Sequence, residues 1–338
     1  MVGSDVTLAV RKSVPRVCII LLNWNSGDLT AECLRSIERI QYQNFYVIVV
    51  DNGSTDGSAE RLREEFPWIR VMCNGANLGF AEGNNRGIVA ALGDPATEYL
   101  LILNNDTVVD EHILREFQAA AEGHSDAGMF TAKIYYFEPR DVLWFAGSTV
   151  NLWTLSFRHI GMGEKDAGQY DCPREIGFVT GCCMFVRREV IERVGAFEPG
   201  FFIYCEDTDW SLRVRRAGFR LLYVPTAKLW HKESASIRKN APRVRSASQE
   251  ETGRGRAYFH YYLRVRNPFL VARRNARGLQ YFTAAIAQIA RTGKWVYKAL
   301  AEGQVGGCFA AIRGCVDSFR PGVSSVSSRR TGTTGSQL

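Results

Sequence analysis

The sequence of 338 residues lacks the features that mark several large classes of protein. No apolar run approaches the ~20 residues that a membrane-spanning helix requires. Residues 1–16 contain no basic segment followed by an apolar one, so we expect no secretory signal. The nine cysteines are an odd number without a C-x-x-C pair, which argues against a disulfide framework or a zinc cage. These absences favour a globular protein of the reducing cytoplasm.

Two nucleotide-binding signatures are missing as well. The first apolar run is not followed by G-x-G-x-x-G, and G-x-x-x-x-G-K-[ST] occurs nowhere in the chain. A dinucleotide-dependent enzyme and a P-loop ATPase therefore lose their main support. The composition is ordinary, with 46% hydrophobic and 23% charged residues. The length suits one large domain with an extension, or two domains.

Acidic residues become scarce toward the C-terminus. Residues 1–237 carry 24 Lys and Arg against 31 Asp and Glu, whereas residues 238–338 carry 18 against 4. A tail with a net charge of +14 suits an anionic membrane surface, a nucleic acid or anionic substrate groups. No RNP, KH or zinc-finger pattern accompanies the charge, so we expect no nucleic-acid partner.

Short apolar runs alternate with helix-period segments in the first hundred residues. The runs are typical of strands buried on both faces, and they lie at 17–22, 46–50, 69–72 and 99–103. Helical periodicity fills the intervals, at 29–40, 58–66 and 81–92. The alternation predicts an α/β fold with a mostly parallel, doubly wound sheet. In such sheets ligands bind outside the carboxyl ends of the strands.

Each of the four strands is followed by a polar loop of small residues. These loops supply the candidate binding side chains at that edge: Asn23, Asp51, Ser54, Asn77, Gly79, Asn104, Asn105 and Asp106. Asp51 suits contact with a ribose or base, although it and Ser54 could instead cap the following helix. Asp106 suits a hard divalent cation that completes its shell with water and phosphate oxygens, the alternative being an Asx turn.

Three acidic residues cluster later in the chain, in Glu206-Asp207-Thr208-Asp209 before a predicted helix at 209–217. Capping explains one or two acids at a helix start, but not three. We interpret Asp207 as a general base toward a hydroxyl, Glu206 as an orienting or acceptor-binding group, and Asp209 as the helix cap. On spacing alone His231 is a structural or surface histidine.

The C-terminal part differs in composition. We divide the chain into an N-terminal extension (1–15), a main domain (16–240), a basic, aromatic helical extension (241–320) and a disordered tail (321–338). Arg264 and Arg266 lie at helical spacing among aromatic residues and suit a diphosphate, the alternative being a helix with its arginines in water. The helical segment 279–290 is amphipathic; it suits the inner leaflet of a membrane, or else the core or a homodimer interface.

Taken together, these motifs resemble the family-2 inverting glycosyltransferases, most closely the rhamnosyltransferase-like branch. The resemblance covers about residues 16 to 270 and rests on ordered segments at 19–25, 49–58, 77–85, 103–107, 181 with 195–198, and 206–210. It implies the GT-A fold, a nucleotide-diphospho-sugar donor such as dTDP-L-rhamnose, and a hydroxyl acceptor on a cell-surface glycan or a polyprenyl-diphosphate-linked precursor. Together with the cysteine usage and the amphipathic segment, this leads us to expect a cytoplasmic enzyme that is peripheral on the inner face of the membrane.

The resemblance assigns roles to individual positions. Asn23 and Asp51 correspond to base and ribose contacts, Asn77 and Gly79 to a loop over the nucleoside, and Asp207 to the catalytic base. Asp106 corresponds to the last residue of a DxD-type motif that binds Mg²⁺ or Mn²⁺, and His231 to a histidine that completes the metal site. Substrate contacts are implied for Gly181 and Trp210.

Two positions depart from the family pattern. Asn104 replaces the first Asp of the DxD-type motif, and Glu198 replaces the usual Asp of G-x-F-D. Because one metal ligand is lost, a second hypothesis remains: the protein is a catalytically silent partner subunit that binds a sugar nucleotide.

Overall fold

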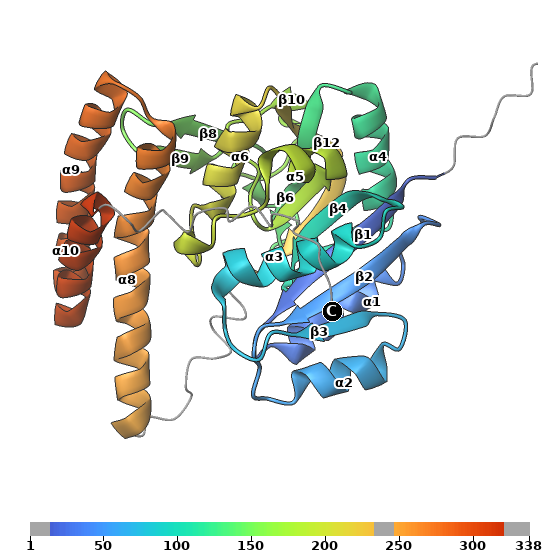
Figure 1. Ribbon diagram of the computed structural model, residues 1–338, viewed down its shortest axis with the longest axis horizontal. Helices are drawn as coiled ribbons and strands as arrows, with labels where there is room; N and C mark the ends of the chain where they lie inside the picture. The colour runs from blue at the N-terminus through green and yellow to red at the C-terminus, as the bar shows by residue number, and fades with distance from the viewer. Residues whose placement is uncertain (1–13, 233–246, 321–338) are drawn as a thin grey trace, which may run out of the picture.

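The computed structural model describes residues 14–232 and 247–320. The predicted disordered tail and nearly all of the N-terminal extension lie outside these ranges. Figure 1 shows an α/β body with a separate group of three C-terminal helices packed at its side.

A ten-stranded sheet forms the centre of the body. Its order is β10-β12-β6-β11-β4-β1-β2-β3, with β5 on β12 and β7 on β6. The first four strands match the predicted runs: β1 (Arg16–Asn23), β2 (Phe45–Asp51), β3 (Arg70–Cys73) and β4 (Thr97–Asn104). The remaining members are β5 (Thr107–Val109), β6 (Ala127–Tyr136), β7 (Leu143–Phe145), β10 (Arg174–Glu175), β11 (Cys183–Arg187) and β12 (Arg220–His231). The strands β1 to β4 pair in parallel, whereas β11 runs antiparallel between β4 and β6.

Helices cover both faces of the sheet, as the doubly wound prediction requires. Their bounds are α1 (Gly27–Ile37), α2 (Ser58–Glu65), α3 (Gly79–Leu92), α4 (Ile113–Gly123), α5 (Arg188–Val194) and α6 (Glu206–Arg216). The chain moves from β1 to β2 to β3 in one direction and returns from β3 to β4 in the other. Right-handed crossovers then place α1 and α2 on one face and α3 on the opposite face. The predicted fold class is confirmed.

The C-terminal extension is helical, as predicted. It consists of α8 (Ala247–Asn275), α9 (Leu279–Ala301) and α10 (Val305–Phe319), which pack on one another. A hairpin of β8 (Ser148–Asn151) and β9 (Ser156–His159) lies beside the bundle in Figure 1. Leu155 at the hairpin tip is buried against Phe269 and Ala284, so the hairpin joins the bundle to the body. Among the helices of the described ranges, none is both long and apolar enough to cross a membrane.

Candidate active site at the carboxyl edge of the sheet

The ends of β1 and β2 lie side by side, with Asn23 paired to Asp51. The Asn23 amide nitrogen donates to Asp51 Oδ2 at 2.9 Å and to Ser58 Oγ at 2.8 Å, and its oxygen accepts from the Thr30 hydroxyl. Asp51 Oδ1 accepts from the backbone N–H of Ser54 at 3.0 Å. Both side chains are buried. Asn23, predicted to contact the base, therefore has its polar atoms engaged within the protein, where it fixes the orientation of the Asp51 carboxylate.

The loop before α3 is held by Asn52, a residue that sequence reasoning missed. Its amide nitrogen donates to Asn77 Oδ1 at 3.0 Å and to Gly79 O at 3.2 Å, and its oxygen accepts from Leu78 N. Gly79 has a φ of +80°, and a Cβ there would lie 2.6 Å from the Phe202 ring. Glycine is required at this position both by the backbone angle and by the close approach of the ring.

Asp106 and His231 meet although they are far apart in the sequence. Asp106 follows β4 and His231 ends β12, and their Oδ1 and Nε2 atoms lie 3.1 Å apart. Both are buried, and His231 Nδ1 has no hydrogen-bond partner. Asn105 instead donates to the Ser26 and Thr30 hydroxyls, and Asn104 is half-buried at the strand end.

This pair could supply two ligands of a metal site. A carboxylate and an imidazole suit a divalent ion such as Mn²⁺. Within residues 14–232 and 247–320, no three His, Cys, Asp or Glu side chains gather into a metal-binding group. The residues present therefore fit an ion that takes its remaining ligands from water and from a bound diphosphate.

Asp207 lies in the first turn of α6 and its carboxylate is held by backbone N–H groups. Oδ2 accepts from Gly181 N at 2.9 Å, and Oδ1 accepts from Thr208 N at 2.6 Å. Burial raises the pKa of Asp207, and these hydrogen bonds oppose part of the rise. Burial, and next the charge of Asp207, raise the pKa of Glu206 well above its ordinary value. Since Glu206 Oε2 is buried without a partner, we assign Glu206 as the protonated member of the pair.

The pairing of β11 with β4 places Asp207 at the same edge of the sheet as Asp106. Gly181, which holds Asp207, lies just before β11, and β11 begins opposite Leu103 of β4. Asn104 N donates to Cys182 O at 3.0 Å. Burial raises the pKa of Cys182, and the nearby charge of Asp106 raises it further. Asp51, Asp106 and Asp207 therefore all lie at the carboxyl edge of the parallel strands.

The loop that leads into Asp207 has an unusual backbone. Phe202, Tyr204 and Cys205 have φ values of +65°, +73° and +67°, each in the left-handed region that disfavours side-chain-bearing residues. The Asn267 amide nitrogen lies 2.8–3.0 Å from the carbonyl oxygens of Phe201, Ile203 and Tyr204. Asn267 is fully buried on α8. The C-terminal extension thus holds the strained loop that carries the candidate base.

Arg264 and Arg266 of α8, which were both predicted to bind a diphosphate, have different environments. Arg266 is buried, and its Nη2 donates to Gly200 O at 2.7 Å. The prediction that Arg266 binds a diphosphate is therefore corrected, because its guanidinium is committed to the loop carbonyls. Arg264 is exposed and stacks on the rings of Tyr204 and Trp295, with its Cζ 4.9 and 5.7 Å from their centroids.

Trp210 and Asp209 also differ from their predicted roles. Trp210 is fully buried against Phe197, and its Nε1 donates to Gly195 O at 2.8 Å. It belongs to the core and has no surface for a substrate. Asp209 does not cap α6; it is fully buried and accepts from Arg213 Nε and Arg274 Nε, each at 2.9 Å.

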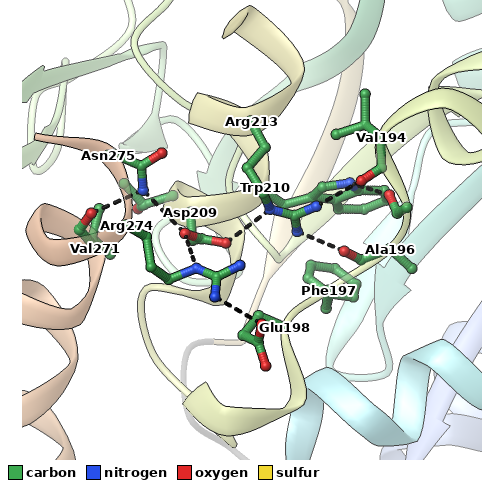
Figure 2. Close-up of polar contacts among 12 residues, drawn as sticks. Val194, Ala196, Phe197, Glu198, Asp209, Trp210, Arg213, Val271, Arg274 and Asn275 are labelled. Atoms are coloured by element: carbon green, nitrogen blue, oxygen red, sulfur yellow. Dashed lines mark hydrogen bonds and ion pairs between the residues drawn. The ribbon is translucent and has the colours of Figure 1, made fainter. Parts of the chain in front are cut away.

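Figure 2 shows how this cluster joins three segments. Arg213 also donates to the carbonyl oxygens of Val194 and Ala196. Arg274 pairs with Glu198 at 2.8 Å, so the longer glutamate at this position reaches α8. The cluster around Asp209 ties α6 to α8 and to the segment before η1 (Pro199–Phe201).

Comparison with known proteins identifies the family. Residues 18–195 match the family model described as glycosyl transferase family 2. An N-acetylglucosaminyl-diphospho-decaprenol L-rhamnosyltransferase of Mycobacterium tuberculosis is 26% identical over 260 residues, covering 69% of this chain and 81% of that protein. The dTDP-rhamnosyl transferase RfbF of Shigella flexneri is 25% identical over 244 residues, covering 71% and 74%.

Two solved structures share the fold. The structure of GalNAc-T7 with UDP, GalNAc and Mn²⁺ has a TM-score of 0.54 at 14% identity, covering 65% of this chain and 44% of that one. The mannosyltransferase PcManGT from Pyrobaculum calidifontis, in complex with GDP-Man and Mn²⁺, has a TM-score of 0.50 at 16% identity, covering 90% and 87%. These likenesses confirm the predicted GT-A fold. The chain therefore belongs to glycosyl transferase family 2, and rhamnosyltransferases are among its relatives.

Proposed function

We propose that this glycosyltransferase moves L-rhamnose from dTDP-rhamnose to a hydroxyl of a polyprenyl-diphosphate-linked glycan precursor, with inversion at the anomeric carbon. The observation that carries the proposal is the placement of Asp51, Asp106 and Asp207 at one edge of the sheet. The rhamnosyltransferases among the relatives support the choice of sugar, and the decaprenol-linked acceptor in the name of the mycobacterial relative supports the choice of acceptor.

The proposed chemistry assigns one task to each group. Asp51, oriented by Asn23, binds the nucleoside of the donor. Asp207 accepts the proton of the acceptor hydroxyl as that oxygen attacks the anomeric carbon and the nucleoside diphosphate departs from the opposite face. Burial raises the pKa of Asp207 toward neutral pH, and a general base is most effective when its pKa lies near the pH at which the enzyme works. Mg²⁺ or Mn²⁺ would be held by Asp106 and His231 and would neutralise the charge of the departing diphosphate.

A thermal-shift panel tests donor binding. We expect dTDP-rhamnose to raise the melting temperature more than UDP or GDP sugars, because a ligand that binds only the folded state stabilises it. Mn²⁺ should increase this shift in the wild type. Asp106→Asn should abolish the increase, whereas Asp126→Asn, on the surface beside Arg220, should keep it. Equal shifts for all sugars would contradict the choice of donor.

A catalytically silent binding subunit is the second candidate, and the substitution of Asn104 for an acidic ligand favours it. It predicts the same thermal shifts but no chemistry. Metal-dependent release of dTDP from dTDP-rhamnose, followed by chromatography, separates the two candidates.

We further propose that the extension binds the inner leaflet of the membrane. α9 and α10 expose large apolar side chains on successive turns: Phe282, Ile286, Ile289, Tyr297, Leu300, Val305, Phe309, Ile312 and Val316. Basic residues, including Lys298 and Arg313, lie on the same helices. An apolar face with flanking cations is typical of helices that lie in the interface of an anionic bilayer. A homodimer interface is the alternative occupant of this face.

Liposome flotation tests the membrane proposal. We expect the wild type to float with anionic vesicles and a Phe282→Glu, Phe309→Glu variant to stay at the bottom, because each glutamate places a charge in the apolar face. Val89→Glu, at an exposed valine of α3, is the matched control and should float. If the double variant floats like the wild type but has a lower molecular mass in solution, the apolar face is a homodimer interface instead.

A further inference from the structure

A basic groove lies between the β8–β9 hairpin and α9. It has a volume of about 790 Å³, and three cationic side chains line it: Arg158 of the hairpin, and Arg291 and Lys294 of α9. The Thr154 and Ser156 side chains add hydroxyl groups to the lining. In Figure 1 the hairpin lies beside the upper part of the helical bundle, away from β1 to β3. The volume is in the range of small-ligand sites, ~300–1,000 Å³.

The three cations have no anionic partner in the part of the chain that the structure describes. Arg291 Nη1 donates to Leu155 O at 3.2 Å, while its Nε is buried without a hydrogen-bond partner. Arg158 Nε donates to its neighbour Ser156 Oγ, and Lys294 has no ion pair with any residue of 14–232 or 247–320. A half-buried guanidinium without a carboxylate is costly, since the desolvation of its buried Nε is not offset by a counter-charge. An anionic ligand would supply that charge.

The hairpin that forms one wall of the groove packs near the loop that carries the candidate base, because Leu152, Phe157 and Cys205 all contact one buried apolar cluster around Phe201. Burial raises the pKa of Cys205, the residue just before Glu206 and Asp207, and the charge of Arg291 opposes the rise. Burial lowers the pKa of Arg291, and the cation of Arg264 lowers it further. Arg264, which stacks on Tyr204 of the same loop, adds a second cation near Cys205.

We propose that this groove binds the diphosphate group of the lipid-linked acceptor. The inference rests on the proposed function and adds the place where the acceptor is held. The donor diphosphate belongs at Asp106 and His231, whereas the groove lies near the loop that leads into the base, and the base must face the acceptor hydroxyl. Arginine and lysine form strong charge-assisted hydrogen bonds with phosphate oxygens, and Arg can do so with two N–H groups at once. The bundle that flanks the groove carries the apolar face proposed to meet the membrane, where the polyprenyl chain lies.

The test measures binding of geranyl diphosphate by calorimetry. We expect an Arg158→Gln, Lys294→Gln variant to bind it at least 10-fold more weakly than the wild type, because two charge-assisted contacts are lost. Lys298→Gln, one turn along α9 and outside the groove, is the matched control and should bind like the wild type. Arg291→Lys, which keeps the charge but loses the planar fork, should weaken binding with an unchanged melting temperature.

Two further measurements make the result decisive. The thermal shift with dTDP-rhamnose should be the same in the double variant as in the wild type; its absence in both would refute the proposed function independently of the groove. Unchanged affinity of the double variant for geranyl diphosphate, with that shift intact, would overturn the groove proposal alone. The groove proposal would also be overturned if the double variant no longer floated with anionic vesicles but still bound geranyl diphosphate. The cations would then bind a phospholipid headgroup.

Discussion

Asp207→Asn is expected to lower turnover by ~100-fold or more, since general-base catalysis typically contributes 10²–10⁴. Asparagine has nearly the same shape and can keep the contact with Gly181 N, but it cannot accept the proton of the acceptor hydroxyl. The measurement is kcat with saturating donor and acceptor. Turnover near that of the wild type would remove Asp207 from the role of base.

Glu206→Gln is the matched control for this experiment. Glu206 is buried next to Asp207, and burial holds its carboxyl in the protonated form. Glutamine resembles that neutral form, so we expect a loss of less than ~10-fold, well below the range for a general base. If Glu206→Gln lowered turnover as much as Asp207→Asn, the proton transfer would be assigned to the Glu206–Asp207 pair and not to Asp207 alone.

The pH profile gives a second readout of the same base. Asp207 must be deprotonated to act, so kcat falls as the pH falls through its pKa. Because burial raises this pKa, the acidic limb should lie above the ordinary aspartate value of about 3.9. An acidic limb at or below that value would contradict the buried environment of the carboxylate.

Asp209→Ala is expected to lower the free energy of unfolding by about 3–5 kcal/mol. The substitution removes the carboxylate between Arg213 and Arg274 and leaves both guanidinium groups partly buried without it. Urea unfolding followed by circular dichroism measures the change.

Asp126→Ala is the control, because Asp126 pairs with Arg220 at 3.1 Å but its side chain is 57% exposed. An exposed pair of this kind contributes at most about 1 kcal/mol. Equal losses for the two variants would show that the Asp209 cluster is not the link between α6 and α8 described above.

β1, β2 and β4 were predictable because these strands are buried on both faces, whereas β3 lies at the edge of the sheet and, contrary to the prediction, is partly exposed. Runs such as 99–103 are apolar throughout, and the polar residues that follow three of the runs, Asn23, Asp51 and Asn104, mark the carboxyl edge. Asp51, Asp106 and Asp207 could be proposed as site residues on this basis and on the resemblance. Their meeting at one edge depends on β11, whose antiparallel insertion beside β4 carries Gly181 to Asp207.

The contacts that the sequence did not reveal are long-range. Asn267 holds carbonyl oxygens more than sixty residues away, and no local pattern distinguishes such an amide from one on a surface. The same is true of Arg266 and Trp210: an arginine beside aromatics and a tryptophan in a helix have the same local pattern whether they face a ligand or the protein interior. The role of Asn52 likewise depends on partners about 25 residues away, Asn77 and Gly79, which no local pattern indicates.

The most direct test of the account is a crystal structure of the protein with dTDP and Mn²⁺. We expect the nucleoside at Asp51, Mn²⁺ on Asp106 with His231 beside it, and the terminal phosphate facing the Asp207 carboxylate across a space that fits a sugar. Nucleotide bound elsewhere, or an Asp207 carboxylate directed away from the diphosphate, would contradict the proposed active site.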